Sequence, residues 1–483
     1  MVSSPICGAS GPRFAAVRAL LAGRSARRAT EASPIRSHDP IDEENLPNFA
    51  ADQTVYTTPW GTQLHGDSLD LLDSLADSSV DLIITSPPFA LQRKKAYGNE
   101  DQDAYVDWLA QFGEAAKRVL KDTGSLVIDI GNAYRKGSPT RSLYPYRVLL
   151  KFVDELGYHL AEEFFWYNPA KLPSPLEWVN KRRIRVKDAV NTVWWFSKTE
   201  WPQADVNRVL QPYSKNMEKL LKDPEKYYKT SLRPSEHEIS KHFGNDNGGA
   251  IPPNLLQISN TESNTNYLRL CRELAIKSHP ARFPNDLPKF FIEFLTTPGD
   301  VVVDIFSGSN TTGMVAEQLG RKWYSFELNR DYAALSIMRF LPSIPAKAAL
   351  RLYEKARENA VSLPSEARAL VPDAIQSAEQ SFRHAEKELH AAEVQRKLKF
   401  EHIEELEHRA EKEQATAVGT GRELVAAMQS AGEEAALAME RQSIAMKRIK
   451  LEAKALATAH AAAAALDNFY GPAVVTLPDG QTD

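Results

Sequence analysis

The chain has 483 residues, a formal net charge of −4 and 43% hydrophobic residues. This length predicts roughly two or three domains. Its two cysteines, Cys7 and Cys271, exclude a disulfide scaffold and a cysteine-rich zinc site, and we expect no metal. There is no run of about 18 apolar residues, so we expect no membrane span.

Residues 1–50 are rich in Ala, Arg and Ser and contain no acid before Glu31. This composition is typical of an organelle transit peptide, but also of a disordered basic arm or of a start codon placed too far upstream. We expect a disordered basic extension, without excluding organelle targeting by residues 1–30.

Residues 51–200 alternate apolar strands with amphipathic helices, which predicts an α/β fold with a largely parallel sheet. The expected strands are 80–85, 125–130 and 192–197, and the expected helices are 105–120 and 146–156.

The first of these strands runs into Ser86-Pro87-Pro88-Phe89. The two prolines stiffen the turn and leave carbonyl groups free to accept hydrogen bonds. Phe89 adds a flat ring on which a planar substrate can stack. Acceptors beside such a ring suit the exocyclic amine of a flipped-out base. Taken alone, the same four residues are as typical of an ordinary turn at a strand end.

Clusters of basic residues follow this turn, whereas the acidic residues of the chain are concentrated in its C-terminal region. In 181–187 the apolar Ile184 and Val186 alternate with basic residues, which predicts a strand with one apolar and one basic face. Such a face can contact DNA phosphates, although a solvated face is the commoner outcome from charge alone. The candidate phosphate ligands are Arg93, Lys94, Lys95, Arg183, Arg185 and Lys187.

Residues 201–278 have little periodicity and are rich in Lys, Asn, Gly and Pro. The side chains best suited to reading base edges are Arg233, His237, Lys241, Asn245 and Asn247. Each of them singly is more often a loop residue or a phosphate contact.

A second strand, which begins at Val301, enters a loop of small residues that leads into a helix. Small residues allow a ligand to approach the backbone, and a helix N-terminus presents free N–H groups. The next strand, 322–327, ends at Glu327, about 20 residues after the loop, where a carboxylate binds ribose hydroxyls in doubly wound folds. An ordinary βαβ unit with a solvated acid is the alternative.

These motifs together resemble the DNA amino-methyltransferases of the permuted β class, in which the Ser-Pro-Pro-aromatic loop precedes the S-adenosylmethionine loop. The resemblance is strongest to the PvuII-type cytosine-N4 methyltransferases and covers about residues 52–341. The motifs that carry it are Gly66-Asp67-Ser68-Leu69, Ser86 to Phe89, Phe89 to Lys95, Lys181 to Asp188, His279 to Pro284, and Val301 to Gly313.

The resemblance implies a Rossmann-like methyltransferase fold with circularly permuted motif order. Its parts are a catalytic half (51–200), a target-recognition region (201–278) and an S-adenosylmethionine-binding half (279–341). The implied catalytic residues are Ser86, Pro87, Pro88 and Phe89. The implied cofactor ligands are Asp67, Arg282, Phe283, Asp304, Phe306, Gly308, Asn310, Thr311, Thr312 and Glu327. Many relatives have glycine in place of Asn310, although the PvuII-type enzymes share the asparagine.

The implied activity is methyl transfer to N4 of a flipped-out cytosine in double-stranded DNA, as part of a restriction-modification system in a prokaryotic cytoplasm. The suggested palindrome is CAGCTG. Adenine-N6 methylation by the same fold is the alternative, which Ser86 disfavours because adenine enzymes usually carry Asp or Asn there. A catalytically silent DNA-binding scaffold is the third hypothesis. Cytosine C5 methylation is disfavoured because neither cysteine follows a proline.

Residues 342–465 are rich in Ala, Glu, Lys, Arg and Gln, and Pro364 and Pro372 interrupt them early. This pattern predicts long helices that form a coiled-coil hairpin with a thin alanine seam, followed by a tail at 466–483. The sequence leaves open whether this extension mediates self-association or partner binding, or is a solvated spacer.

Overall fold

The computed structural model describes residues 47, 49–89, 104–224, 244–261, 265–416 and 421–472. These form two compact units. The sheet unit contains the described residues up to Pro342 together with Ala349–Ala367, and the helical unit contains Ser343–Ala348 and the described residues from Arg368 onward. No helix in the described part of the chain is long and apolar enough to cross a membrane.

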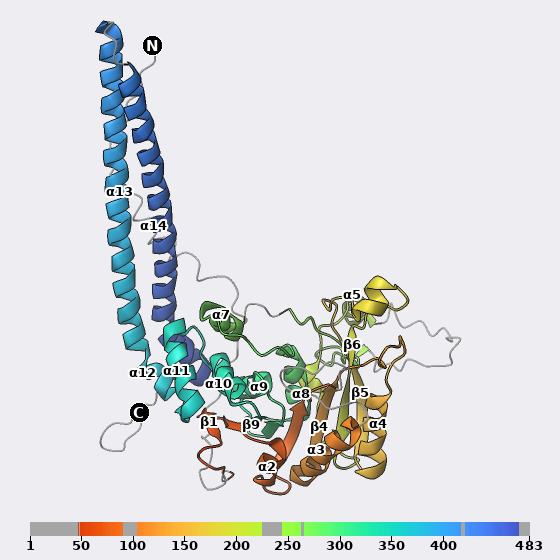
Figure 1. Ribbon diagram of the computed structural model, residues 1–483. Coiled ribbons are helices and arrows are strands. Elements are labelled where there is room, and N and C mark those ends of the chain that lie inside the picture. The colour runs from red at the N-terminus through yellow and green to blue at the C-terminus, as the bar shows by residue number, and fades with distance from the viewer. Residues whose placement is uncertain are drawn as a thin grey trace, which may run out of the picture. The chain divides into compact units, whose positions relative to one another are not determined.

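The sheet unit is built on one mixed sheet, seen in Figure 1, whose strand order is β10-β1-β2-β9-β8-β3-β4-β6-β5-β7. Strands β2, β9, β8, β3 and β4 are mutually parallel, so their carboxyl ends meet at one edge of the sheet. This arrangement confirms the predicted α/β fold. The strands are β1 Thr54–Thr57, β2 Gly61–His65, β3 Val80–Thr85, β4 Leu120–Ile130, β5 His159–Tyr167, β6 Val190–Ser197, β7 Leu255–Gln257, β8 Val301–Asp304, β9 Lys322–Glu327 and β10 Val361–Ser362.

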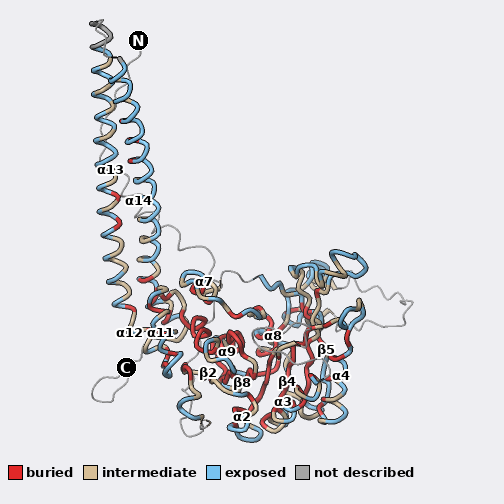
Figure 2. The backbone as a smooth tube through the Cα atoms, viewed as in Figure 1, coloured by how far each residue is buried: buried red, intermediate tan, exposed pale blue. Residues whose placement is uncertain are grey.

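Helices cover both faces of this sheet, which explains why its central strands are apolar on both sides. Figure 2 shows the buried backbone concentrated in these strands and in the helices against them. On one face α2, α3 and α4 pack over Ile83, Leu126 and Phe196. On the other face α8 packs through Phe294 against Trp195. The helices of this unit are α2 Ser68–Asp73, α3 Tyr105–Val119, α4 Tyr144–Leu150, α5 Lys215–Lys222, α7 Asn266–Glu273, α8 Asp286–Leu295, α9 Thr311–Gln318, α10 Arg330–Leu335, and most of α11 Ala346–Glu358 and α12 Ser365–Ala369.

Most predicted elements are present with small changes of boundary. Strands β3 and β9 have the predicted bounds, and β4 begins earlier than predicted, at Leu120. The helix predicted over 146–156 begins at Tyr144, because Pro145 occupies its first turn, where a missing N–H costs nothing. It continues as a π-helical turn, Lys151–Glu155.

The strand predicted over 181–187 is wrong. A π-helical turn, Glu177–Lys181, is followed by an irregular segment up to β6, and Arg183 adopts a left-handed conformation with φ 53°. The segment closes on itself through the Asp188 N–H, which donates to the Ser174 carbonyl at 3.1 Å. Without a neighbouring strand to pair with, the alternating pattern does not form a sheet, and Ile184 and Val186 are exposed.

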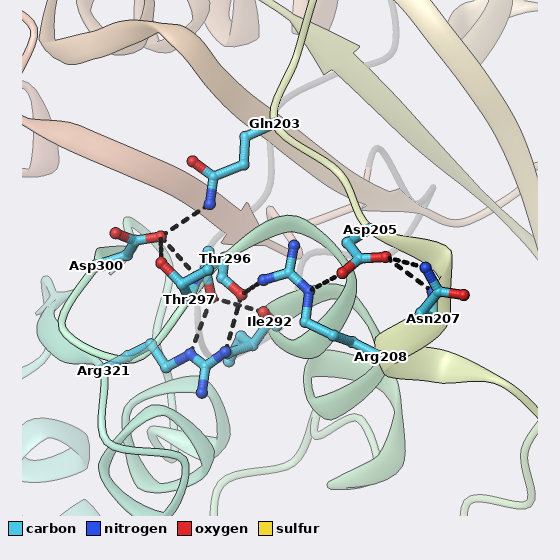
Figure 3. Close-up of polar contacts among 9 residues, drawn as sticks. All are labelled: Gln203, Asp205, Asn207, Arg208, Ile292, Thr296, Thr297, Asp300 and Arg321. Atoms are coloured by element: carbon cyan, nitrogen blue, oxygen red, sulfur yellow. Dashed lines mark hydrogen bonds and ion pairs between the residues drawn. The ribbon is translucent and has the colours of Figure 1, made fainter. Parts of the chain in front are cut away.

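A polar cluster ties the chain that follows β6 to the turn between α8 and β8 (Figure 3). Arg321 donates through Nε to Thr296 Oγ1 at 3.0 Å and through Nη2 to the Thr296 carbonyl at 2.8 Å. Arg208 donates to the same carbonyl. Gln203 reaches Asp300 Oδ2 at 3.1 Å. Two arginines on one carbonyl therefore fix the point at which the chain leaves the sheet after β6.

The helical unit contains two long helices, α13 Val371–Thr416 and α14 Gly421–Tyr470, as predicted. They pack side by side and antiparallel (Figure 1), and ion pairs Arg448–Glu388 at 2.7 Å and Lys399–Glu434 at 2.5 Å join them. Pro372 does not interrupt α13 because it lies in the first turn of the helix.

We predict that Arg321→Met lowers the free energy of unfolding of the sheet unit by about 2–4 kcal/mol, because it removes buried hydrogen bonds and a charge that the carbonyls solvate. Urea denaturation followed by tryptophan fluorescence measures this unit alone, since all 8 tryptophans lie in it. Lys289→Ala, on the exposed side of α8, is the matched control and should change stability by less than about 0.5 kcal/mol. Equal stability of the two variants would contradict the structural role of the cluster.

Candidate active site

An open cleft of about 570 Å³ lies at the edge where the parallel strands end. Each of these parallel strands supplies lining residues at or just beyond its carboxyl end, and β6 supplies them at its start because it runs the opposite way. Of the residues predicted from sequence, those that line the cleft are Asp67, Ser86, Pro87, Pro88, Phe89, Arg282, Phe283, Phe306, Gly308, Thr311 and Glu327.

A buried carboxyl group joins the two motif strands beneath the cleft. Asp304, the last residue of β8, accepts hydrogen bonds from Thr85 Oγ1 at 2.8 Å and Thr312 Oγ1 at 2.6 Å. It also accepts one from the Phe306 N–H at 3.1 Å. Burial raises the pKa of Asp304 to about 6 in spite of these donors. Because Thr85 precedes Ser86 directly, this contact sets the Ser-Pro-Pro-Phe turn against the small-residue loop.

Ser86 belongs to a polar chain that crosses three strands. Its Oγ donates to Asp129 Oδ2 at 3.0 Å, and Asn191 Nδ2 donates to the other oxygen, Asp129 Oδ1, at 3.1 Å. Lys171 Nζ donates in turn to Asn191 Oδ1 at 3.3 Å. Burial raises the pKa of Asp129 to about 6, and the two hydrogen bonds oppose this rise. The Ser86 hydroxyl hydrogen is thus directed to Asp129, which leaves the oxygen lone pairs available to another donor.

Phe89 lies against Gly131, just beyond β4. A Cβ atom at Gly131 would come within 2.3 Å of the Phe89 ring, so only glycine permits this position of the ring. Both Pro87 and Pro88 line the cleft beside Ser86. The turn therefore presents an aromatic face next to a serine oxygen, as the sequence predicts.

The other half of the cleft surrounds Glu327, the last residue of β9. Its two carboxylate oxygens accept hydrogen bonds from the Gly308 and Asn329 N–H groups, each at 2.9 Å. Burial raises the pKa of Glu327 to about 7. Gly308 has φ 52°, and a Cβ there would meet the ring of His279. The backbone of the loop thus approaches the carboxylate closely, and the lone pairs of that carboxylate not used by the two N–H groups are free for a ligand.

Another part of the cleft wall comes from the segment before α8. Arg282 donates through Nη1 to the His279 carbonyl and to Ser278 Oγ at 3.3 Å. Asn260, just after β7, donates to the Arg282 carbonyl at 2.8 Å. The pKa of His279 is lowered by burial, so this imidazole is neutral at physiological pH.

Three predicted cofactor ligands do not line the cleft. The side chains of Asp304 and Thr312 are hydrogen-bonded to each other beneath the cleft. Asn310 is fully buried, with φ 54°, and its Oδ1 accepts from the Gly313 N–H at 2.9 Å and from Ser325 Oγ at 2.8 Å. Asparagine tolerates this left-handed conformation better than most residues, and its side chain also caps α9.

Several residues of the site were missed by sequence reasoning. Asp129, Asn191 and Lys171 line the cleft, and Arg339 supports it by donating to the Ser309 carbonyl at 2.6 Å. One signal was available, since Asp129 is an acid within an otherwise apolar run of β4. No comparable signal marks Arg339.

Only some of the residues predicted to contact DNA lie in the part of the chain that the structure describes. Arg93, Lys94, Lys95, Arg233, His237 and Lys241 lie outside the described residues. Arg183, Arg185 and Lys187 are exposed, and Lys187 Nζ donates to the Pro169 carbonyl at 3.0 Å, beside the cleft residue Lys171. Asn245 and Asn247 are exposed, and the Asn247 N–H donates to Tyr213 Oη at 2.8 Å.

Comparisons with known proteins agree with this geometry. The chain is 61% identical over 301 residues to the type II methyltransferase M.PvuII of Proteus hauseri, a match that covers 62% of this chain and 89% of that protein. It is 26% identical over 287 residues to the DNA adenine methyltransferase YhdJ of Escherichia coli (strain K12), covering 58% and 82%.

Among solved structures, the PvuII DNA methyltransferase (cytosine-N4-specific) superposes with a TM-score of 0.54 at 50% identity, covering 65% of this chain and 98% of that one. The family model described as DNA methylase matches residues 80–338, which include every element of the cleft from β3 to β9. The chain therefore belongs to the DNA methylase family.

Proposed function

We propose that this protein transfers a methyl group from S-adenosylmethionine to the exocyclic N4 of a flipped-out cytosine in duplex DNA, as the modification enzyme of a restriction-modification system. The observation that carries the proposal is the Ser86–Asp129 pair beside Phe89, at 3.0 Å, in a cleft whose other half is built around Glu327. The similarity to M.PvuII supports the choice of base. A prokaryotic cytoplasm, where both substrates are present, is the proposed location.

The cofactor half fits S-adenosylmethionine by the chemistry of its donors and acceptors. Glu327 offers carboxylate lone pairs to ribose hydroxyls, and Asp67, at the N-terminus of α2, lies on the same side of the cleft for the adenine amine. Phe306 and Phe283 line the space between as apolar walls. When bound, S-adenosylmethionine supplies an electrophilic methyl group on a sulfonium centre.

We assign Asp304, Asn310 and Thr312 to the support of this half. Asp304 and Thr312 fix the start of α9, and Asn310 caps it. The ligand would then contact the loop through the backbone and through Gly308 and Thr311, which line the cleft.

The catalytic half is built to hold an amine. The lone pair of an aromatic amine is conjugated into its ring, so acceptors that draw the N–H groups out of the ring plane make the nitrogen a better nucleophile. Ser86 Oγ and the Pro87 carbonyl are the proposed acceptors, and Phe89 is the surface on which cytosine stacks. Because Ser86 gives its own hydrogen to Asp129, its oxygen can only accept from the amine.

Asp129 also offers a route for the proton that the methylated amine must lose. Its pKa of about 6 keeps it mostly ionised at pH 7, yet within reach of protonation through the Ser86 hydroxyl. Asn191 and the ammonium group of Lys171 hold the carboxylate in place. The proton would pass from the amine to Ser86 Oγ while the Ser86 hydroxyl hydrogen moves to Asp129.

The proposed DNA contacts use the basic residues at the rim, Arg183, Arg185 and Lys187, together with Arg93, Lys94 and Lys95 outside the described residues. Base readout is assigned to the region 201–278, with Arg233, Lys241 and Asn247 as candidate readers. The proposed reaction needs no residue of the C-terminal helices.

The test is transfer of a labelled methyl group to duplexes that carry CAGCTG or a scrambled site, followed by nucleoside mass spectrometry. We expect N4-methylcytosine, reduced roughly a hundredfold or more in Ser86→Ala and Phe89→Ala. Asp129→Asn should lower the rate of transfer while leaving S-adenosylmethionine binding unchanged. Lys289→Ala, an exposed residue of α8 that does not line the cleft, is the control.

N6-methyladenine as the product would favour the adenine alternative, and no product on either duplex would contradict the proposed activity. Product formed by Ser86→Ala at the full rate would contradict the assignment of the amine acceptor while leaving the activity intact.

Binding of S-adenosylmethionine should strengthen as pH rises from 6 to 8. Below its pKa of about 7, Glu327 is protonated and loses acceptor capacity toward ribose hydroxyls. At a pH above this pKa, the ionised carboxylate accepts hydrogen bonds from both ribose hydroxyls. We expect Kd to fall by about tenfold over this range in calorimetric titrations, since one pKa unit corresponds to a factor of ten. Glu327→Gln should bind more weakly with a flat pH profile. The same slope in this variant would assign the titration to another group.

A further inference from the structure

The seam between α13 and α14 is made largely of small side chains. Along α14 the positions that face α13 recur every three or four residues, which is the spacing of a coiled coil. In the middle of the helix these positions are Ala431, Ala435, Ala438, Gln442 and Ala445. The large apolar side chains of this stretch are therefore not the ones that hold the hairpin together.

Those large side chains point away from α13. Leu437, Ile444 and Leu451 are 55%, 59% and 66% exposed, respectively. They are spaced by seven residues, and seven residues make nearly two full turns, so all three lie on one face of α14. We define this face as the outer stripe. A continuous line of exposed branched aliphatic residues at coiled-coil spacing is a helix-packing surface that its own hairpin leaves uncovered.

We propose that the outer stripe binds the outer stripe of a second copy of this chain, with the two α14 helices antiparallel and a two-fold axis at Ile444. In this register Ile444 meets its own copy, and Leu437 of each helix lies opposite Leu451 of the other. The four helices would then lie side by side in the order α13, α14, α14, α13, with the two outer stripes covered in the middle. A surface that is its own complement suits a two-fold dimer.

The charges that flank the outer stripe select this partner and this orientation. Glu433 and Glu440 lie before Ile444, and Lys447 and Lys454 follow it, all on the same side of the stripe. None of the four forms an ion pair with another described residue of the chain. In an antiparallel pair centred on Ile444, Glu440 falls opposite Lys447, and Glu433 opposite Lys454, to within one residue. On the other side of the stripe Arg441 falls opposite Arg448, so this orientation forms opposite-charge pairs at two positions and a like-charge pair at one.

A parallel pair would instead form more like-charge pairs than opposite-charge pairs. Flanking positions on opposite sides of the stripe would then meet, so that Glu433 lies beside Glu434 of the second helix and Lys447 beside Arg448, and only Glu440 beside Arg441 is an opposite-charge pair. Like charges at such positions are destabilising. The pattern therefore favours the antiparallel self-pair.

The first test is the molar mass of the full chain by light scattering during size-exclusion chromatography. We expect a dimer, converted to a monomer by Ile444→Glu. Val425→Glu is the matched control, because Val425 is 63% exposed on the same helix but lies off the stripe. It should remain dimeric. Helix content by circular dichroism shows whether α14 is still folded in each variant. A wild-type monomer, or a dimer that persists in Ile444→Glu, would overturn the proposal.

A charge exchange tests the register. Glu440→Lys alone and Lys447→Glu alone should each raise the dimer dissociation constant about tenfold, since each creates two like-charge pairs across the axis. The double variant, Glu440→Lys with Lys447→Glu, should restore the wild-type value. Additive weakening in the double variant would exclude the antiparallel register centred on Ile444.

Cysteine cross-linking locates the axis directly. In a Cys7→Ser background, Ile444→Cys should give a covalent dimer with a short bis-maleimide reagent. Leu437→Cys should not, because its two copies would be about 21 Å apart along the helix axis. The Leu437→Cys chain mixed with the Leu451→Cys chain should cross-link. Cross-linking of Leu437→Cys to itself would overturn the proposed register.

Discussion

The cleft depends on the contact between Asp304 and Thr85, which joins the ends of two strands that are far apart in the sequence. Asp304 Oδ1 receives Thr85 Oγ1 at 2.8 Å, while Oδ2 receives Thr312 Oγ1 at 2.6 Å from the first turn of α9. Thr85 is followed at once by Ser86. One buried carboxyl group therefore sets the distance between the proposed amine acceptors and the proposed cofactor loop. Its burial is costly for an ionised acid, and the three donors that it receives offset that cost.

Buried acids recur around the cleft, and each owes its raised pKa to burial. Asp129 and Asp304 have pKa values of about 6, and Glu327 has one of about 7. Asp129 is suited to take up a proton, Asp304 to align two loops, and Glu327 to bind hydroxyl groups. Strand topology produces this concentration, because parallel strands bring their carboxyl ends, and the side chains found there, to the same edge.

Sequence reasoning identified the residues that sit in contiguous motifs and missed those that the topology brings together. The turn at Ser86 and the strand end at Glu327 were predicted, since a strand followed by small or rigid residues is visible in one dimension. Asn191 and Lys171 reach the site only because β6 runs antiparallel between β4 and β5. The strand proposed around Arg185 failed for a related reason, because an alternating pattern does not reveal whether a neighbouring strand is available for pairing.

The most direct test of this account is the single-turnover rate of methyl transfer by Thr85→Val, which removes one hydroxyl and keeps the shape of a buried side chain. Displacement of the Ser86 turn relative to the cofactor loop should slow transfer at least about tenfold, because reacting groups tolerate little misplacement. The Kd for S-adenosylmethionine should change by less than about threefold, since Glu327 and Gly308 are untouched. An unchanged transfer rate, or a loss found wholly in cofactor binding, would contradict the claim that Asp304 aligns the two halves of the site.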